Sequence, residues 1–197
     1  MSELNTVVIV GSSLAGLRAA ETLRLEKYEG RIIIVGAEDR QPYDRPPLSK
    51  KVLSGEWEAD RISLRKPDDL AKLNIDWKLG SAATALDTTN HTITLASGET
   101  IAFDGLIIAT GSGVRKLPNQ PDWNGVHVVR TLDDSLALRA NLNPGARVVV
   151  IGAGMGGLAA AADLARRGAA VTVLERAAAP GGKMREVMVD GSPIDGG

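Results

Sequence analysis

The chain has 197 residues, of which 44% are hydrophobic and 24% charged, as in an ordinary folded protein of one large or two small domains. The net charge of -1 and the aromatic content of 3% give no basis for a nucleic-acid partner. The sequence contains no cysteine, which excludes disulfide scaffolds, thiolate metal sites and a redox-active dithiol. Any electron transfer must therefore use a bound cofactor.

Targeting signals and metal ligands are not expected. Residues 1–5 are polar, without the basic and apolar regions of a signal peptide, and no segment approaches the roughly 20 apolar residues of a membrane span. His91 and His127 are far apart and have no metal-ligand spacing to a partner. We therefore expect a cytoplasmic protein with no membrane span and no metal.

The first 35 residues predict a βαβ unit. Residues 6–10 are a short β-branched run that ends at Gly11, residues 14–25 place leucine and alanine at helical spacing, and residues 31–35 form a second buried run. Such a unit implies a parallel sheet with a right-handed crossover. The first strand should lie inside that sheet, between parallel neighbours.

The middle of the chain predicts shorter elements. A proline-rich loop from residue 39 leads into a short helix at Pro46 and Pro47, and a second short helix begins at residue 67. A strand is expected over 75–79, an antiparallel ribbon over 85–102 and a buried strand over 106–109.

The end of the chain repeats the opening pattern. A helix over 133–142 precedes a strand over 147–151, a second helix that runs to Arg167 and a strand over 170–174. We expect an α/β fold with Rossmann-like dinucleotide-binding βαβ units around a parallel sheet and an inserted antiparallel ribbon. The expected domains are an FAD-binding domain over 1–112, a connector and helix over 113–145, and an incomplete dinucleotide-binding unit over 146–197.

The second glycine motif, GAGMGG at residues 152–157, fits the GxGxxG pattern between a strand and a helix. Gly152 permits the tight turn, Gly154 lets the backbone approach a pyrophosphate, and Gly157 lets the helix pack on the strand. Glu175 ends the second strand, where a carboxylate can accept bonds from ribose hydroxyls. The alternative is a purely structural, glycine-rich packing turn that binds no ligand.

The first glycine motif, GSSLAG at residues 11–16, is less regular. Gly11 and Gly16 occupy the outer glycine positions and Ala15 precedes the third, but Ser13 stands at the central one, where its hydroxyl can meet a phosphate. Glu38 follows the second strand and is the expected ribose ligand, with Asp39 as its rival. The alternative is a plain helix-start turn.

The block PYDRPPLSK at residues 42–50, after VGAE at 35–38, closely resembles the FAD domain of the NAD(P)H-dependent ferredoxin and rubredoxin reductases. The resemblance runs from about residue 5 to 151 and includes FDGLIIATG at 103–111 and RTLDD at 130–134. It implies that Thr110 and Gly111 lie at the FAD site and that Arg45 and Lys50 lie beside the flavin. A cation there would stabilise negative charge on the reduced ring and tune its potential.

A second resemblance begins near residue 148. Ala159 stands where those reductases usually have a glutamate, and residues 148–183 are similar to the N-terminal FAD motif of the phytoene desaturase and amine oxidase group. This likeness implies that Gly181 and Gly182 lie against an FAD pyrophosphate and that Lys183 adds a cation. Ile194 would open that group's next strand.

Together the two resemblances imply a flavoprotein. The leading expectation is an oxidoreductase that passes electrons from NAD(P)H through FAD to a ferredoxin or rubredoxin, with the flavin in the chemical role and Lys50 and Arg45 tuning it. One alternative is a desaturase-like FAD enzyme that acts on a carotenoid precursor. Another is a truncated or chimeric nucleotide-binding module without turnover.

Overall fold

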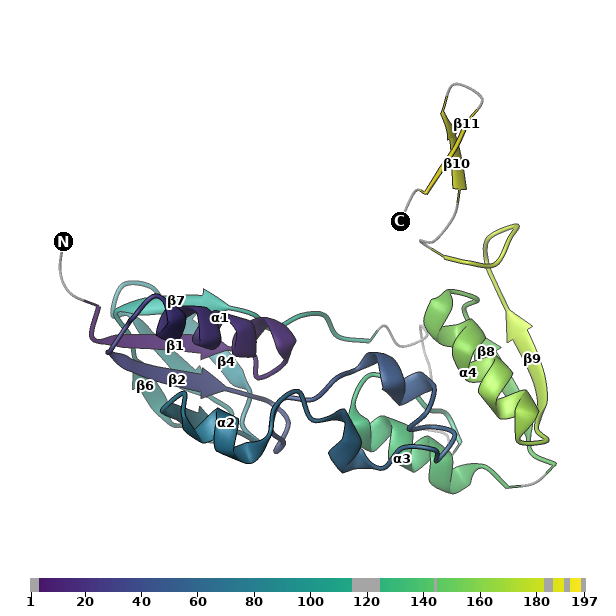
Figure 1. Ribbon diagram of the computed structural model, residues 1–197, viewed down its shortest axis with the longest axis horizontal. Coiled ribbons are helices and arrows are strands. Elements are labelled where there is room, and N and C mark those ends of the chain that lie inside the picture. The colour runs from purple at the N-terminus through teal and green to yellow at the C-terminus, as the bar shows by residue number, and fades with distance from the viewer. Residues whose placement is uncertain (1–3, 115–124, 144, 183–185, 190–191, 196–197) are drawn as a thin grey trace. The chain divides into compact units, whose positions relative to one another are not determined.

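The computed structural model describes residues 4–114, 125–143, 145–182, 186–189 and 192–195 (Figure 1). The chain forms two compact units. The first combines Met1–Asp44 with Ser63–Gly113, and the second combines Arg45–Ile62 with Val114–Gly197.

The first unit is built on a parallel sheet of four strands in the order β3-β2-β1-β7. These strands are β1 (Thr6–Val10), β2 (Arg31–Val35), β3 (Ile75–Lys78) and β7 (Gly105–Ile108). β1 pairs in parallel with both β2 and β7, so it lies inside the sheet as the sequence predicts. The carboxyl ends of all four strands therefore meet at one edge, the usual place for a ligand in an open α/β sheet.

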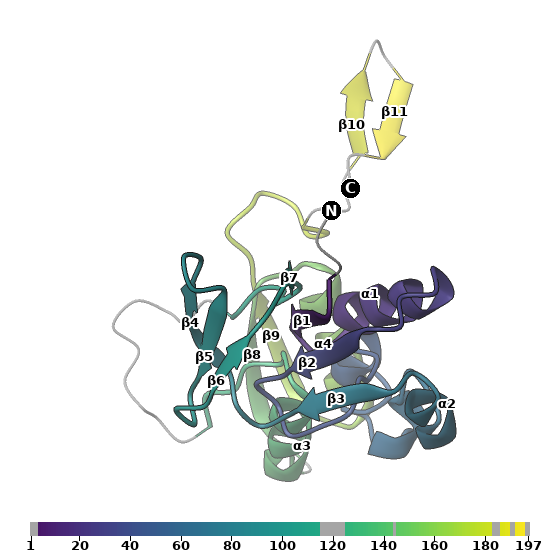
Figure 2. The same ribbon diagram turned by 90° about the vertical axis from the view of Figure 1, so that its left-hand side faces the viewer.

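The two faces of this sheet are covered by different structures (Figure 2). Helix α1 (Leu14–Leu25) packs on one face, because the sequence between β1 and β2 places aliphatic residues at helical spacing. The antiparallel strands β4 (Ala83–Asp87), β5 (Thr92–Leu95) and β6 (Thr100–Ala102) cover the other face. The short helix α2 (Pro67–Ala71) precedes β3.

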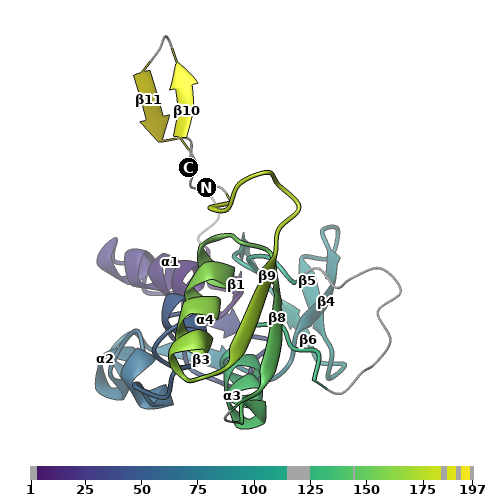
Figure 3. The ribbon, with the colours of Figure 1, turned by 90° about the vertical axis from the view of Figure 1, so that its right-hand side faces the viewer.

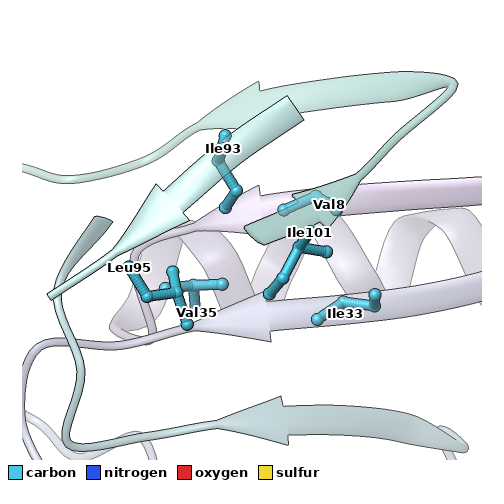
Figure 4. Close-up of a cluster of buried hydrophobic side chains, with 6 residues drawn as sticks. All are labelled: Val8, Ile33, Val35, Ile93, Leu95 and Ile101. Atoms are coloured by element: carbon cyan, nitrogen blue, oxygen red, sulfur yellow. The ribbon is translucent and has the colours of Figure 1, made fainter. Parts of the chain in front are cut away.

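Alternate residues of the central strands enter two hydrophobic clusters. Toward the antiparallel strands, the buried side chains are Val8, Ile33, Val35, Ile93, Leu95 and Ile101 (Figure 4). Toward α1 they are Val7, Ile9, Ala20, Ile32 and Ile34. Burial on both sides explains why β1 and β2 read as continuous apolar runs rather than as alternating ones.

The second unit contains the repeated pattern (Figure 3). β8 (Arg147–Ile151) and β9 (Ala170–Leu174) pair in parallel, and α4 (Met155–Arg166) connects them. Val148, Val150 and Val171 pack toward Leu164 of α4. The α/β class with two βαβ units and an antiparallel ribbon, which the sequence predicts, is confirmed.

The remaining helices of this unit are α3 (Leu132–Asn141) and two short 3-10 helices, η1 (Pro46–Ser49) and η2 (Ala59–Ile62). A capping box starts α3. Thr131 Oγ1 accepts a bond of 3.1 Å from Asp134 N, and Asp134 Oδ2 accepts one of 2.7 Å from Thr131 N. Reciprocal bonds of this kind satisfy donors that the helix start would otherwise leave open.

Residues 45–62 belong to the second unit because side chains of later helices bind their carbonyl groups. Ser135 Oγ, which is fully buried, donates to Leu48 O at 2.7 Å. Arg167 donates to Leu53 O at 2.6 Å, and Arg139 donates to Val52 O at 3.3 Å. The segment is therefore held both by these hydrogen bonds to distant residues and by buried apolar side chains, among them Leu53 in the same hydrophobic cluster as Leu164 of α4.

Two elements differ from the sequence expectation. The helix expected at Pro46 is a single 3-10 turn, although proline does occupy its first turn. Near the end of the chain, β10 (Glu186–Val189) and β11 (Ser192–Asp195) form an antiparallel hairpin, where the sequence led us to expect only the beginning of a strand at Ile194.

Candidate dinucleotide-binding turns

The first glycine turn follows β1 at the carboxyl edge of the sheet. Gly11 has a φ of 124°, which side-chain-bearing residues rarely adopt, and its N–H donates to Val35 O at 2.8 Å. A Cβ on Gly11 would lie 2.1 Å from Ala109 O and 3.0 Å from Thr110 N. The end of β7 therefore presses directly against this turn, and only a glycine fits between the two segments.

Helix α1 begins directly after that turn. Ser13 is its N-cap residue with extended backbone angles, and the first turn of α1 carries no acidic side chain. A Cβ on Gly16 would lie 1.9 Å from Gly11 O, so this glycine lets the helix pack closely against the strand end. Ala15 is exposed in the first turn. An open helix start without a carboxylate is suited to a phosphate.

The carboxylate expected to bind ribose is placed at the same edge. Glu38 lies just after β2, and its Oε2 accepts a hydrogen bond from the hydroxyl of Tyr43. Its backbone is also held, because Gly80 N donates to Glu38 O at 3.1 Å. Asp39, the alternative ligand, is exposed in the following bend.

Thr110 and Gly111 follow β7, so they too lie at the carboxyl edge. Both are exposed, and Gly111 has a φ of 69°. The structure thus brings four of the expected positions in the first unit to one edge of one sheet, namely the Gly11 turn, Glu38, Thr110 and Gly111.

Arg45 and Lys50 belong to the second unit. The guanidinium of Arg45 donates to Arg130 O at 2.7 Å, so the side chain is tied to the residues that lead into α3. Lys50 is exposed at the end of η1. Their position beside a flavin remains a prediction from the resemblance.

The second glycine turn repeats the geometry of the first. Gly152 has a φ of 99°, and its N–H donates to Leu174 O at 2.7 Å. A Cβ on Gly157 would lie 1.9 Å from Gly152 O. Gly154 is the N-cap residue of α4, and no atom lies within 4 Å of the place where its Cβ would stand. This turn therefore has the close helix packing that the GxGxxG pattern predicts, with open space on the Cβ side of Gly154.

The carboxylate of Glu175 binds the turn itself. Its two oxygens accept hydrogen bonds from Ala177 N at 2.8 Å and from Ala153 N at 2.6 Å. These backbone donors, Ala177 first, lower the pKa of Glu175 below the usual glutamate value because they favour the charged form. Binding of a ribose by Glu175 remains a prediction. A carboxylate in that role would also hold the glycine turn in place through its bond from Ala153 N.

Gly181 and Gly182, which follow β9, contact the second glycine turn. Gly181 N donates to Ala153 O at 2.8 Å and forms a parallel bridge with Gly154. A Cβ on Gly182 would lie 3.0 Å from the Cα of Gly154. Two glycine segments thus meet at the start of α4. Lys183, which was expected to add a cation here, lies outside the described residues.

The sequence interpretation missed two contacts in the first unit. Tyr43 was read only as part of the proline-rich block, and its spacing of five residues from Glu38 gave no signal of their hydrogen bond. Gly36 was assigned no role, yet a Cβ there would lie 2.2 Å from the hydroxyl oxygen of Ser12. The first glycine turn is therefore packed against the chain after β2 as well as against β7.

The described part of the chain lacks the features of two other kinds of site. No group of three or more histidine, cysteine, aspartate or glutamate side chains is placed to hold a metal ion. Among the same residues, no helix has the length and apolar character needed to cross a membrane.

Comparison with curated proteins places this geometry among known reductases. The chain is 39% identical over 173 residues to the ferredoxin–NAD(+) reductase component of the biphenyl dioxygenase system of Paraburkholderia xenovorans, a match that covers 87% of the chain and 42% of that protein. It is 37% identical over 182 residues to putidaredoxin reductase of Pseudomonas putida, covering 90% of the chain and 43% of that protein. The chain thus spans less than half the length of these relatives.

Solved structures of reductases are also similar to this chain. The reductase in the covalent putidaredoxin reductase–putidaredoxin complex superposes with a TM-score of 0.83 and 38% identity, covering 88% of this chain and 43% of that one. The NADH:rubredoxin oxidoreductase of Clostridium acetobutylicum gives a TM-score of 0.78 with 28% identity, over 94% of this chain and 48% of that one.

A family model described as pyridine nucleotide-disulphide oxidoreductase matches residues 5–189, which include both glycine turns. Because the chain has no cysteine, the disulphide chemistry in that description has no counterpart within these 197 residues. The chain belongs to the pyridine nucleotide-disulphide oxidoreductase family.

Proposed function

We propose that the chain is the FAD-binding part of a reductase that passes electrons from NAD(P)H to a ferredoxin or rubredoxin. The observation that carries this proposal is the convergence of the Gly11 turn, the start of α1 and the Glu38 carboxylate at the carboxyl edge of one parallel sheet. An anion-binding helix start beside a ribose-binding acid is the arrangement that a dinucleotide requires.

The residues of the first unit suit FAD. The backbone at Gly11 and Ser13 would meet the pyrophosphate, since the outer glycines keep the turn tight and the positive end of the α1 dipole favours an anion there. Glu38 would accept bonds from the adenosine ribose, and Thr110 and Gly111 would line the site from β7. When bound, FAD would supply the redox chemistry, taking a hydride from NAD(P)H and releasing electrons singly to an iron–sulfur protein.

The second unit is proposed to bind the nicotinamide nucleotide. Gly152, Gly154 and Gly157 would hold its pyrophosphate, and Glu175 at the end of β9 would favour NAD over NADP because a carboxylate repels a 2′-phosphate. A different ligand for this unit is favoured by one observation. Gly181 and Gly182 close on Gly154, as the resemblance to desaturases implies for a second FAD pyrophosphate.

The partner and the flavin-side cations rest on the likeness to whole reductases. The relatives are described as reductases of ferredoxins, among them putidaredoxin. Arg45 and Lys50 would stabilise negative charge on the reduced flavin, since a fixed cation near that ring favours its anionic form. We keep the expected domains, 1–112, 113–145 and 146–197, and a cytoplasmic location as parts of the same proposal.

The visible absorption spectrum of the purified protein, recorded before and after anaerobic addition of NADH, tests this function. Flavin bands that bleach with NADH would support both nucleotide sites. Bands that persist would leave an FAD-binding module without turnover, and would contradict the NADH site. Activity on a carotenoid precursor without nicotinamide would favour the desaturase alternative. The absence of flavin even after incubation with FAD would overturn the cofactor assignment.

A further inference from the structure

We propose that Tyr43 is a positioning residue that holds the Glu38 carboxylate in the orientation needed to bind the adenosine ribose of a dinucleotide in the first unit. The inference rests on the proposed function, because it concerns the same FAD site. It adds a residue outside the glycine turn and outside the flavin-side cations, and it assigns that residue a definite atom to control.

Tyr43 itself is firmly placed. Its side chain is 8% exposed, and its backbone forms an antiparallel bridge with Ser63. The neighbouring Pro42 O accepts a hydrogen bond of 3.0 Å from Leu64 N. The loop after β2 is thus tied to the segment before α2, and the phenol ring has little freedom to leave its site.

The hydroxyl of Tyr43 donates to Oε2 of Glu38. The backbone of Glu38 is fixed independently, because its carbonyl accepts the bond from Gly80 N, and Gly36 N donates to Lys78 O at 2.9 Å two residues earlier. Backbone and side chain of the carboxylate are therefore held by separate elements of the same unit. A glutamate fixed in this way does not need to lose its rotamer freedom when a ligand binds.

The chemistry of the contact suits a supporting role. An ionised carboxylate has two oxygens with about four acceptor positions, so one bond from a phenol does not exhaust its capacity. A phenol is also a neutral donor, so this contact fixes the geometry without cancelling the negative charge. Ribose hydroxyls bind best to an acceptor that keeps its charge, because charge-assisted hydrogen bonds are the stronger ones.

The test uses ADP, the half of FAD that carries this ribose, and its 2′,3′-dideoxy analogue, with affinities measured by titration calorimetry. Tyr43→Phe removes only the hydroxyl. We expect it to weaken ADP binding by roughly tenfold, the size of one lost charge-assisted bond. Binding of the dideoxy analogue should change by no more than about twofold, because that ligand has no ribose hydroxyls for Glu38 to bind.

The chain offers a matched control, since it has two tyrosines. The hydroxyl of Tyr28 bonds to Arg31 O at 3.4 Å, at the start of β2 rather than at its end. Tyr28→Phe should leave both affinities unchanged. In a Glu38→Ala background, adding Tyr43→Phe should have no further effect on ADP binding, because the residue it positions is gone.

The outcomes separate this inference from the proposed function. A wild-type chain that binds neither FAD nor ADP contradicts the function and the inference with it. A chain that binds ADP equally well with Tyr43→Phe keeps the function and overturns the role of Tyr43. An equal loss for ADP and for the dideoxy analogue would also overturn it, since the effect would then come from the fold of the turn and not from the ribose.

Discussion

The two βαβ units have nearly the same turn but very different surroundings. In each, a strand of five residues leads to a glycine whose N–H bonds the last carbonyl of the second strand, at 2.8 Å in the first unit and 2.7 Å in the second. In each, a Cβ on the third motif glycine would lie 1.9 Å from the carbonyl of the first. The turn is therefore determined locally, by the glycines and the helix that follows.

The strands behave differently because different layers cover them. Val8 lies three residues before Gly11 and is fully buried against the antiparallel strands β5 and β6. Val149 lies three residues before Gly152 and is 60% exposed, as Ile151 is at 62%. In the described residues, β8 and β9 alternate between half-buried and exposed positions. The comparison teaches that nearly the same glycine turn can form at the end of sheets with very different surroundings.

The largest expected effect comes from a charge placed on that sheet face in each unit. Val8→Glu would bury a carboxylate without a partner and should cost at least about 4 kcal/mol in the free energy of unfolding. Val149→Glu should change it by no more than about 0.5 kcal/mol, because the side chain already meets solvent. Hydrogen exchange of the β1 and β8 amides measures the two effects separately. Equal losses of protection in both units would contradict the comparison.

The next effect concerns the glycine that each unit uses to pack its helix. Gly16→Ala and Gly157→Ala should each lower the free energy of unfolding by about 1–3 kcal/mol, because the added methyl meets a backbone oxygen that cannot move aside. The adjacent Gly156 supplies the control. It has open space around its Cβ position, so Gly156→Ala should be neutral or stabilising by up to about 1 kcal/mol.

Thermal unfolding of the three variants would check this prediction. A tolerated methyl at Gly157, together with a destabilising one at Gly16, would show that only the first turn is packed as described.

A smaller effect is expected from the acid that ends β9. The backbone donors of Ala177 and Ala153 lower the pKa of Glu175. Stability from this carboxylate is therefore fully present above the glutamate pKa of the unfolded chain and is lost as the pH falls through the lower pKa of the folded chain. Carbon NMR titration should give a midpoint for Glu175 below that of a glutamate in an unfolded peptide. A midpoint equal to or above that of the unfolded peptide would contradict the contact.

The control for this titration is Glu175→Gln. In that variant the amide of Ala153 should lose its acid-dependent protection from exchange, since the titrating acceptor has been removed.

The sequence predicted the parts of this molecule that depend on local pattern. The βαβ units, the position of β1 inside its sheet and the close packing at Gly157 follow from periodicity and glycine spacing, and the structure confirms them. Contacts between residues far apart in the sequence could not be predicted. The hydrogen bond from Ser135 to Leu48 O is an example, because no sequence spacing links these two residues. For residues 45–62 the sequence predicts a short helix at Pro46, but no pattern in it shows that this segment packs in the second unit.

In the candidate site, too, some residues could be predicted from the sequence and others could not. The glycines and the acids Glu38 and Glu175 were readable because each follows a recognisable strand. Their partners were not, since Tyr43 reaches Glu38 through a loop and the oxygens of Glu175 turn back to the amides of Ala153 and Ala177. A pattern identifies which side chains gather at a sheet edge, whereas their orientation depends on neighbours that the pattern does not specify.

The central claim is that the first glycine turn holds FAD. Hydrogen–deuterium exchange of the wild-type protein with and without FAD tests it most directly, because it needs no variant and reads both turns at once. The account predicts slower exchange at the amides of residues 11–17 and in the loop that carries Glu38. Unchanged exchange there, or protection confined to residues 152–158, would contradict it.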